Sequence, residues 1–139
     1  MKTSIYSSTV FMALVLSACA VPAATQALRA EYESTIPVCS SNEDCQQKWT
    51  IARAWVVDNS DFAIRNESKT RIMASSNLIS QSGLGVTVNR NPAEGGNYLI
   101  TVSVECFAAY GCPNSWEIMV DFNRTINAVQ PTPSLEFTN

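Results

Sequence analysis

The sequence predicts an α+β fold, a four-stranded antiparallel meander with an N-terminal and a C-terminal helix packed on one face. Apolar side chains recur at helical spacing at Trp49, Ala52 and Val56, and again near the C-terminus. Between these segments, residues 84–88 and 98–106 alternate apolar and polar side chains, as strands with one covered face do. The connections between the expected strands are short, which favours antiparallel neighbours.

A targeting signal precedes the predicted domain. One positive charge, Lys2, is followed by an apolar run over residues 10–16 and then by Leu16-Ser17-Ala18-Cys19. A membrane-spanning helix needs about 20 apolar residues, and this run is far shorter. Leucine, two small residues and cysteine resemble the lipobox of bacterial lipoproteins, and the resemblance covers the signal region only. An ordinary secretory signal is the alternative, because Ala18-Cys19-Ala20 also offers a small-x-small cleavage pattern.

The lipobox resemblance implies a location. In bacterial lipoproteins the signal is cut before the cysteine, which is then acylated on its thiol and its amino terminus. The acyl chains anchor the protein durably, because each methylene group buried in the bilayer contributes about 0.8 kcal/mol. In the enterobacterial sorting pattern, an aspartate directly after the lipidated cysteine retains the protein in the inner membrane. This chain has Ala20 at that position, which favours the outer membrane. We therefore expect residues 1–18 to be a signal peptide, Cys19 to be lipidated, and the protein to face the periplasm from the bacterial outer membrane.

The mature chain, residues 19–139, is long enough for one domain with a single core. The whole sequence has nine lysine and arginine residues and twelve acidic ones, and losing Lys2 with the signal leaves a net charge of −4. An acidic surface gives no electrostatic reason to expect nucleic acid as a partner.

The remaining cysteines form an even set, as disulfides in an oxidising compartment require. They are Cys39, Cys45, Cys106 and Cys112. Three pairings are possible, and the repeated spacing favours two local loops, Cys39–Cys45 and Cys106–Cys112. A zinc site is the alternative, but it needs two-residue gaps or histidine partners, and the chain has no histidine.

Residues 19–38 are interpreted as a lipidated tether, and residues 39–130 as the single folded domain. Alanine, glutamine, leucine, arginine and glutamate in the tether favour helix. Their apolar positions form no convincing stripe, however, so we expect a mobile arm with some helical content.

The first helix of the domain is expected after Ser41, where capping and acidic residues suit a helix start. It ends at Asp58-Asn59-Ser60. Trp49 and Trp55 are interpreted as core residues packing against the sheet, in preference to a ligand platform.

Four strands follow. Phe62, Ile64 and Asn66 alternate with Ala63, Arg65 and Glu67, and this alternation predicts the first strand. The other three are expected at residues 71–75, 84–88 and 98–106, and residues 91–97 are rich in turn formers.

Residues 107–111 are apolar and aromatic where a loop is normally polar. If the disulfide is local, this segment is a closed loop that displays Phe107 and Tyr110 near a sheet edge. Alternatively, both rings tuck under the sheet and extend the core. Rigid aromatic side chains are enriched among interface hot spots. The functional hypothesis is therefore a partner-binding surface of Phe107 and Tyr110, with Trp116 behind them.

Residues 115–128 fit either a helix or a strand. Asn114-Ser115-Trp116-Glu117 matches a helix N-cap with an acidic residue three positions on. The apolar positions persist at helical spacing to Val129, so we expect a helix. Residues 131–139, which begin with Pro131-Thr132-Pro133, are expected to be a flexible tail.

The sequence offers little catalytic chemistry. Without histidine there is no Ser-His-Asp or Cys-His arrangement, and no glycine-rich loop resembles a nucleotide-binding fingerprint. Glu105, Glu117 and Asp121 are the nearest approach to a carboxylate pair. We therefore expect a protein that is not an enzyme and uses no cofactor or metal.

Two functions stay open. The first is a protein-binding or scaffold module that holds an envelope protein near the outer membrane. The second is an inhibitor or immunity lipoprotein that blocks a periplasmic, cell-wall-cleaving enzyme. Many such enzymes are basic, so the acidity of the chain favours the inhibitor slightly. The folded domain is not assigned to a characterised family.

The anchor is directly testable. Cys19→Ser should abolish labelling with palmitate and release the protein from the membrane fraction, because the acylated thiol is gone. Unchanged palmitate labelling in this variant would contradict the lipobox assignment.

Overall fold

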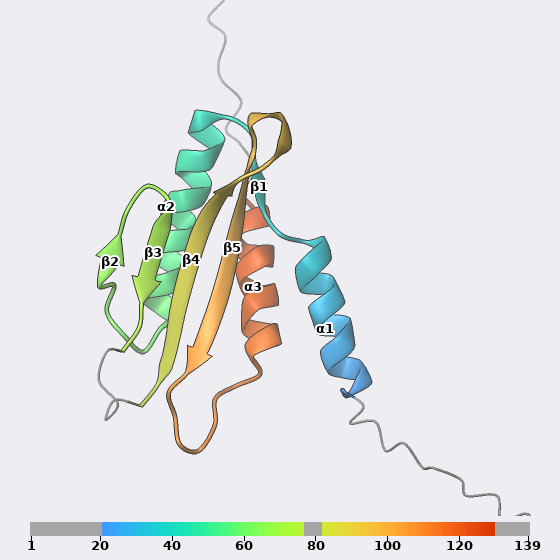
Figure 1. Ribbon diagram of the computed structural model, residues 1–139, viewed down its shortest axis with the longest axis vertical. Coiled ribbons are helices and arrows are strands. Elements are labelled where there is room, and N and C mark those ends of the chain that lie inside the picture. The colour runs from blue at the N-terminus through green and yellow to red at the C-terminus, as the bar shows by residue number, and fades with distance from the viewer. Residues whose placement is uncertain (1–20, 77–81, 130–139) are drawn as a thin grey trace, which may run out of the picture.

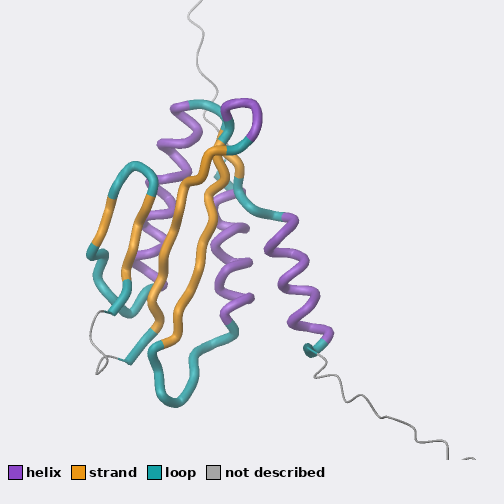
Figure 2. The backbone as a smooth tube through the Cα atoms, viewed as in Figure 1, coloured by secondary structure: helices purple, strands orange, loops and turns teal. Residues whose placement is uncertain are grey.

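The computed structural model describes residues 21–76 and 82–129, which form an α+β structure (Figure 1). Figure 2 shows the same path coloured by secondary structure. In chain order the elements are α1 (Ala23–Ser34), β1 (Val38–Cys39), α2 (Asn42–Asn59), β2 (Asn66–Glu67), β3 (Arg71–Ala74), β4 (Leu84–Pro92), the 3₁₀ turn η1 (Glu94–Gly96), β5 (Tyr98–Cys106) and α3 (Ser115–Asn127).

The strands form one antiparallel sheet in the order β1-β5-β4-β3-β2. Its centre is the long β4–β5 hairpin, in which Leu84 lies opposite Cys106 and Pro92 opposite Tyr98. The predicted meander is present, but the sheet has five strands where four were expected. The additional strand, β1, comes from the end of the segment interpreted as a tether and pairs with the start of β5.

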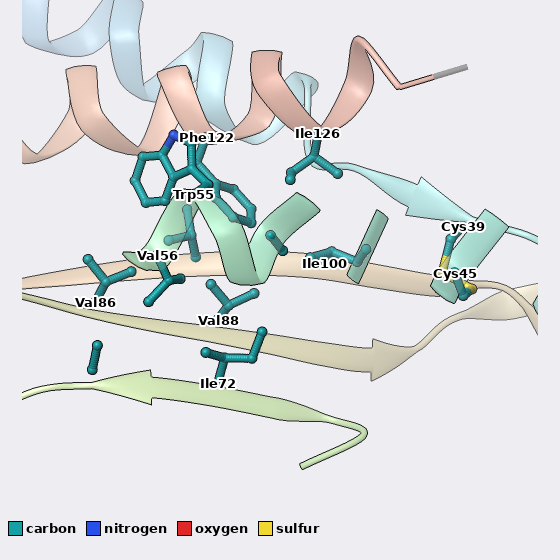
Figure 3. Close-up of a cluster of buried hydrophobic side chains, with 13 residues drawn as sticks. Cys39, Cys45, Trp55, Val56, Ile72, Val86, Val88, Ile100, Phe122 and Ile126 are labelled. Carbon is teal, nitrogen blue, oxygen red and sulfur yellow. A yellow bond between two sulfur atoms is a disulfide. The ribbon is translucent and has the colours of Figure 1, made fainter. Parts of the chain in front are cut away.

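The core lies between the sheet and two helices, α2 and α3, which cover the same face (Figures 1 and 3). Apolar side chains of both helices meet those of the central strands: Trp55, Val56, Phe122 and Ile126 above Ile72, Val86, Val88 and Ile100. The rings of Trp55 and Phe122 pack edge to face, with 5.1 Å between their centroids. The indole nitrogen of Trp55 donates to Asp121 Oδ2 at 2.9 Å, which satisfies its only donor. Trp55 is therefore a core residue, as predicted.

Both expected helices of the domain are present. The Ser41 hydroxyl accepts from the backbone N–H of Asp44 and caps α2, as the sequence pattern predicted. Residues 115–127 are helical, and the Asn114 side chain accepts from the N–H of Trp116 at the start of α3. The helix interpretation of this segment is therefore confirmed, although α3 ends at Asn127.

The first predicted strand is much shorter than expected, because β2 covers only Asn66–Glu67. The chain just before it is held at the start of β4 instead. Asp61 Oδ2 accepts from the N–H of Leu84 at 2.6 Å, and the Ser60 hydroxyl donates to the Leu84 carbonyl. These bonds fix the turn after α2, so residues 62–64 lie outside β2 despite their alternation.

The expected mobile arm is instead packed structure in residues 22–38. Helix α1 buries none of its residues, yet polar contacts hold it on α3. Asn123, wholly buried, donates to the Tyr32 carbonyl at 2.9 Å and to Thr35 Oγ1 at 3.2 Å. Arg124 pairs with Glu31 at 2.8 Å. The expected domain boundary at residue 39 thus falls inside the packed structure. The polar contacts between α1 and α3 leave no apolar pattern in the sequence by which they could be predicted.

Tyr32 ties the same helix to the sheet. Its hydroxyl donates to the Val102 carbonyl of β5 at 2.9 Å. Burial raises the pKa of the Tyr32 phenol above its ordinary value, which lies well above neutral pH already, and the hydroxyl is therefore a donor there. This bond satisfies a carbonyl of β5 beyond the short stretch where β1 pairs with that strand.

Helices α1 and α3 run parallel. Arg29 and Tyr32 meet Trp116 near the start of α3, whereas Thr35 accepts from Asn127 at its end. Both helices therefore begin at the same end of the molecule, the end at which the loop after β5 lies (Figure 1).

Asn123 tests how α1 is held. Asn123→Ala leaves the Tyr32 carbonyl and the Thr35 hydroxyl without their buried donor. We expect a loss of about 1–3 kcal/mol in the free energy of unfolding. Hydrogen exchange in α1 should also become faster than in α2. Asn91→Ala is the matched control, because it removes one bond from an exposed asparagine whose partner, Thr101, lies in the sheet. Equal exchange of α1 in the Asn123 variant and the native protein would contradict this role.

Candidate functional site

Two surface features of the protein are candidate binding sites. One is the disulfide-closed loop between β5 and α3. The other is a cleft at the opposite end of the sheet, between α2 and the strands.

The structure contains two local disulfides, Cys39–Cys45 and Cys106–Cys112. The first joins β1 to the first turn of α2, and both of its cysteines are buried. The second closes residues 107–111 into a short loop. All four cysteines are oxidised, so none of them is a thiolate ligand for a metal.

Phe107 has a packing role. Its ring meets that of Phe62 edge to face, with 5.6 Å between the centroids. It also covers Gly85, where an added Cβ would lie 2.9 Å from Phe107 Cε2. Gly85 precedes Val86, which faces the helices, so alternation places this small cluster on the helix-free face of the sheet. One of the two loop rings is therefore packed, though not under the helices.

Tyr110 is fully exposed. Gly111, which follows it, has a φ of +86° and donates its N–H to the Ala108 carbonyl at 3.2 Å. The N–H of Phe107 bonds to the Gly83 carbonyl at 2.8 Å and extends the pairing of β4 with β5. The loop is thus closed by a disulfide and tied to the sheet, with the Tyr110 ring displayed at its tip.

Trp116 packs against α1. It is half-buried between α1 and α3, with its ring edge-on to Tyr32 at 5.9 Å. The guanidinium of Arg29 lies 5.8 Å from the Trp116 ring centroid. Of the three residues predicted to form one partner surface, the structure leaves Tyr110 alone fully displayed.

The cleft has a volume of about 480 Å³. Its walls come from the first half of α2, the turn between β2 and β3, and the ends of β4 and β5 that meet there: Asn42, Gln46, Trp49, Lys69, Arg90 and Tyr98. A second hollow of about 200 Å³ shares Asn42, Arg90 and Tyr98 with it. Trp49, which the sequence analysis placed in the core, is half-buried and forms one wall of this cleft while also packing against the core.

The cleft is positively charged, although the chain is acidic. None of the residues lining either hollow is acidic. Among the described residues, Arg29, Lys48, Arg53 and Arg124 have carboxylate partners, whereas Arg90 and Lys69 have none. The Arg90 guanidinium lies over the Tyr98 ring at 4.3 Å, and its Nε is buried without a hydrogen-bond partner in the described part of the chain.

The cleft is not evident from the sequence, because its residues are far apart in the chain. Only the register of the sheet, which places Arg90 opposite Ile100, brings Arg90 next to Tyr98. One local feature of the sequence does point to the cleft. Leu84, Val86 and Val88 define the covered face of β4, and Arg90 continues that phase, so a charged residue occupies an apolar position.

Within residues 21–76 and 82–129, no group of three or more cysteine and acidic side chains is placed to hold a metal ion. None of the helices in those ranges combines the length and the apolar character needed to cross a membrane. Comparisons of the chain with protein-family models, curated proteins and solved structures gave no match.

The two loop rings should respond differently to truncation. Phe107→Ala removes a half-buried ring that packs on Phe62 and Gly85. We expect it to cost about 1–3 kcal/mol, less than the 3–5 kcal/mol of a fully buried phenylalanine. Tyr110→Ala should change stability by less than about 0.5 kcal/mol, because the side chain is exposed. Urea unfolding with the disulfides intact measures both, and equal costs would contradict the division of roles.

Proposed function

We propose that the protein is a lipid-anchored, periplasm-facing envelope protein that binds another envelope protein and acts as a scaffold at the outer membrane. The observation that carries this proposal is the full exposure of Tyr110 at the tip of a disulfide-closed loop. A displayed aromatic ring on a closed loop loses little conformational entropy on binding, and tyrosine is enriched among interface hot spots.

The position of α1 adds a constraint to the anchor. Residues 20–22 alone separate Cys19 from Ala23, the first residue of α1. Three residues span at most about 11 Å. Because α1 is packed on α3, a lipid on Cys19 would hold the body of the protein close to the bilayer at the end where α1 begins.

The loop lies at that same end. Helices α1 and α3 are parallel, and the Cys106–Cys112 loop leads directly into the start of α3 (Figure 1). In the anchored protein, the loop that carries Tyr110 would therefore lie on the membrane side. This orientation favours a partner that is itself at the membrane surface. The inhibitor alternative has the acidity of the chain as its support.

A pull-down from detergent-solubilised envelopes tests the proposal. Tyr110→Ala should stay folded and lose the partner that the native lipoprotein recovers, because the displayed ring is removed. Val57→Ala is the matched control, since Val57 is another exposed apolar side chain and lies on α2. Recovery of the same partner by the native protein and the Tyr110 variant would contradict the proposed surface. A single stoichiometric partner that is a cell-wall-cleaving enzyme would support the inhibitor function instead.

A further inference from the structure

We infer that the cleft between α2 and the β4–β5 hairpin is a binding site for the terminal carboxylate of a short peptide. This inference goes beyond the proposed function and does not depend on it. The cleft lies at the end of the molecule away from the Tyr110 loop, and its volume of about 480 Å³ is that of a small-molecule pocket.

The charge of the cleft selects an anion. Arg90 lines both hollows, and the described chain supplies it with no carboxylate and leaves its Nε without an acceptor. The Lys69 side chain stands on the wall beside it, also without an ion-pair partner there. Asp44, the acidic residue buried at the start of α2, is already neutralised by Lys48 at 3.0 Å. An incoming carboxylate would therefore find two cations and no competing acid on the lining.

The stacking of Arg90 favours a ligand that is recognised in one orientation. Its guanidinium carbon lies over the Tyr98 ring, 4.3 Å from the centroid. This contact holds the guanidinium at the Tyr98 wall of the cleft, and the N–H groups of a guanidinium form a rigid planar fork. A planar carboxylate can accept two parallel hydrogen bonds from such a fork, which gives both affinity and geometry.

The rest of the lining suits a peptide better than a bare ion. Asn42 and Gln46 carry side-chain amides, each with donors and an acceptor that match the N–H and C=O of a peptide group. Both are exposed on α2, and neither makes a side-chain hydrogen bond in the described part of the chain. Trp49, half-buried beside them, offers a flat apolar wall for the adjacent side chain.

Calorimetric titration of the full-length lipoprotein in detergent tests the inference, with alanyl-alanine as the probe. The free dipeptide should bind at least about tenfold more tightly than its C-terminal amide. Lys69→Gln and Arg90→Gln should each weaken the dipeptide by a similar factor. Arg71→Gln is the matched control, because Arg71 is an arginine of β3 without a carboxylate partner that does not line the cleft.

Three results would overturn the inference. They are equal affinity for the acid and its amide, unchanged binding in the Lys69 and Arg90 variants, and tighter binding of inorganic phosphate than of the dipeptide. If Arg90→Gln proves unstable because it leaves Tyr98 uncovered, the dipeptide affinity of the Lys69→Gln variant tests the inference by itself. Lys69 is exposed in a turn and supports no core contact.

Discussion

Asn123 is wholly buried in α3, and a buried amide must find hydrogen-bond partners or cost free energy. Its Nδ2 donates to the Tyr32 carbonyl of α1 and to the hydroxyl of Thr35, the residue that follows α1, while its Oδ1 has no hydrogen-bond partner in the described part of the chain. The position of α1 follows from this contact, together with the bond from Tyr32 to β5. Helix α1 buries no residue completely, and it is held by these hydrogen bonds together with the packing of the Tyr32 ring on Trp116 and on the core.

The start of α1 and the cleft lie at opposite ends of the molecule. The parallel arrangement of α1 and α3 puts the N-terminus of α1 at the end that carries the Tyr110 loop (Figure 1). The cleft lined by Arg90, Lys69 and Trp49 lies at the other end, where α2 begins and the β4–β5 hairpin turns. If Cys19 carries lipid, the loop is directed to the bilayer and the cleft to the periplasm. One small domain can in this way present a protein contact and a ligand site on separate surfaces.

Local sequence signals predicted local structure well. Alternation in β4 and β5, the Ser41 cap of α2, the Asn114 cap of α3 and the repeated cysteine spacing all correspond to what the structure contains. These features depend on neighbours within a few residues, so the sequence carries their signal directly.

Features that depend on distant contacts were missed. The packing of helix α1 was not predicted, because its partners on α3, the Asn123 amide and the Trp116 ring, lie far away in the sequence. Phe62 alternates as a strand residue would, yet it packs on Phe107 of the loop. The cleft needs the register of β4 against β5 before Arg90 and Tyr98 meet. Arg90 on the covered face of β4 was the one local sign of it.

If Cys19 is lipidated and α1 stays packed on α3, the Tyr110 loop lies near the bilayer. Paramagnetic broadening by spin-labelled lipid headgroups, measured on the amide signals of the lipidated protein in bicelles, tests this orientation. We expect strong broadening at Tyr110 and little at Gln46 and Gly96, which line the hollows at the opposite end. Weak and equal broadening at all three residues, as a detached α1 would give, would contradict it.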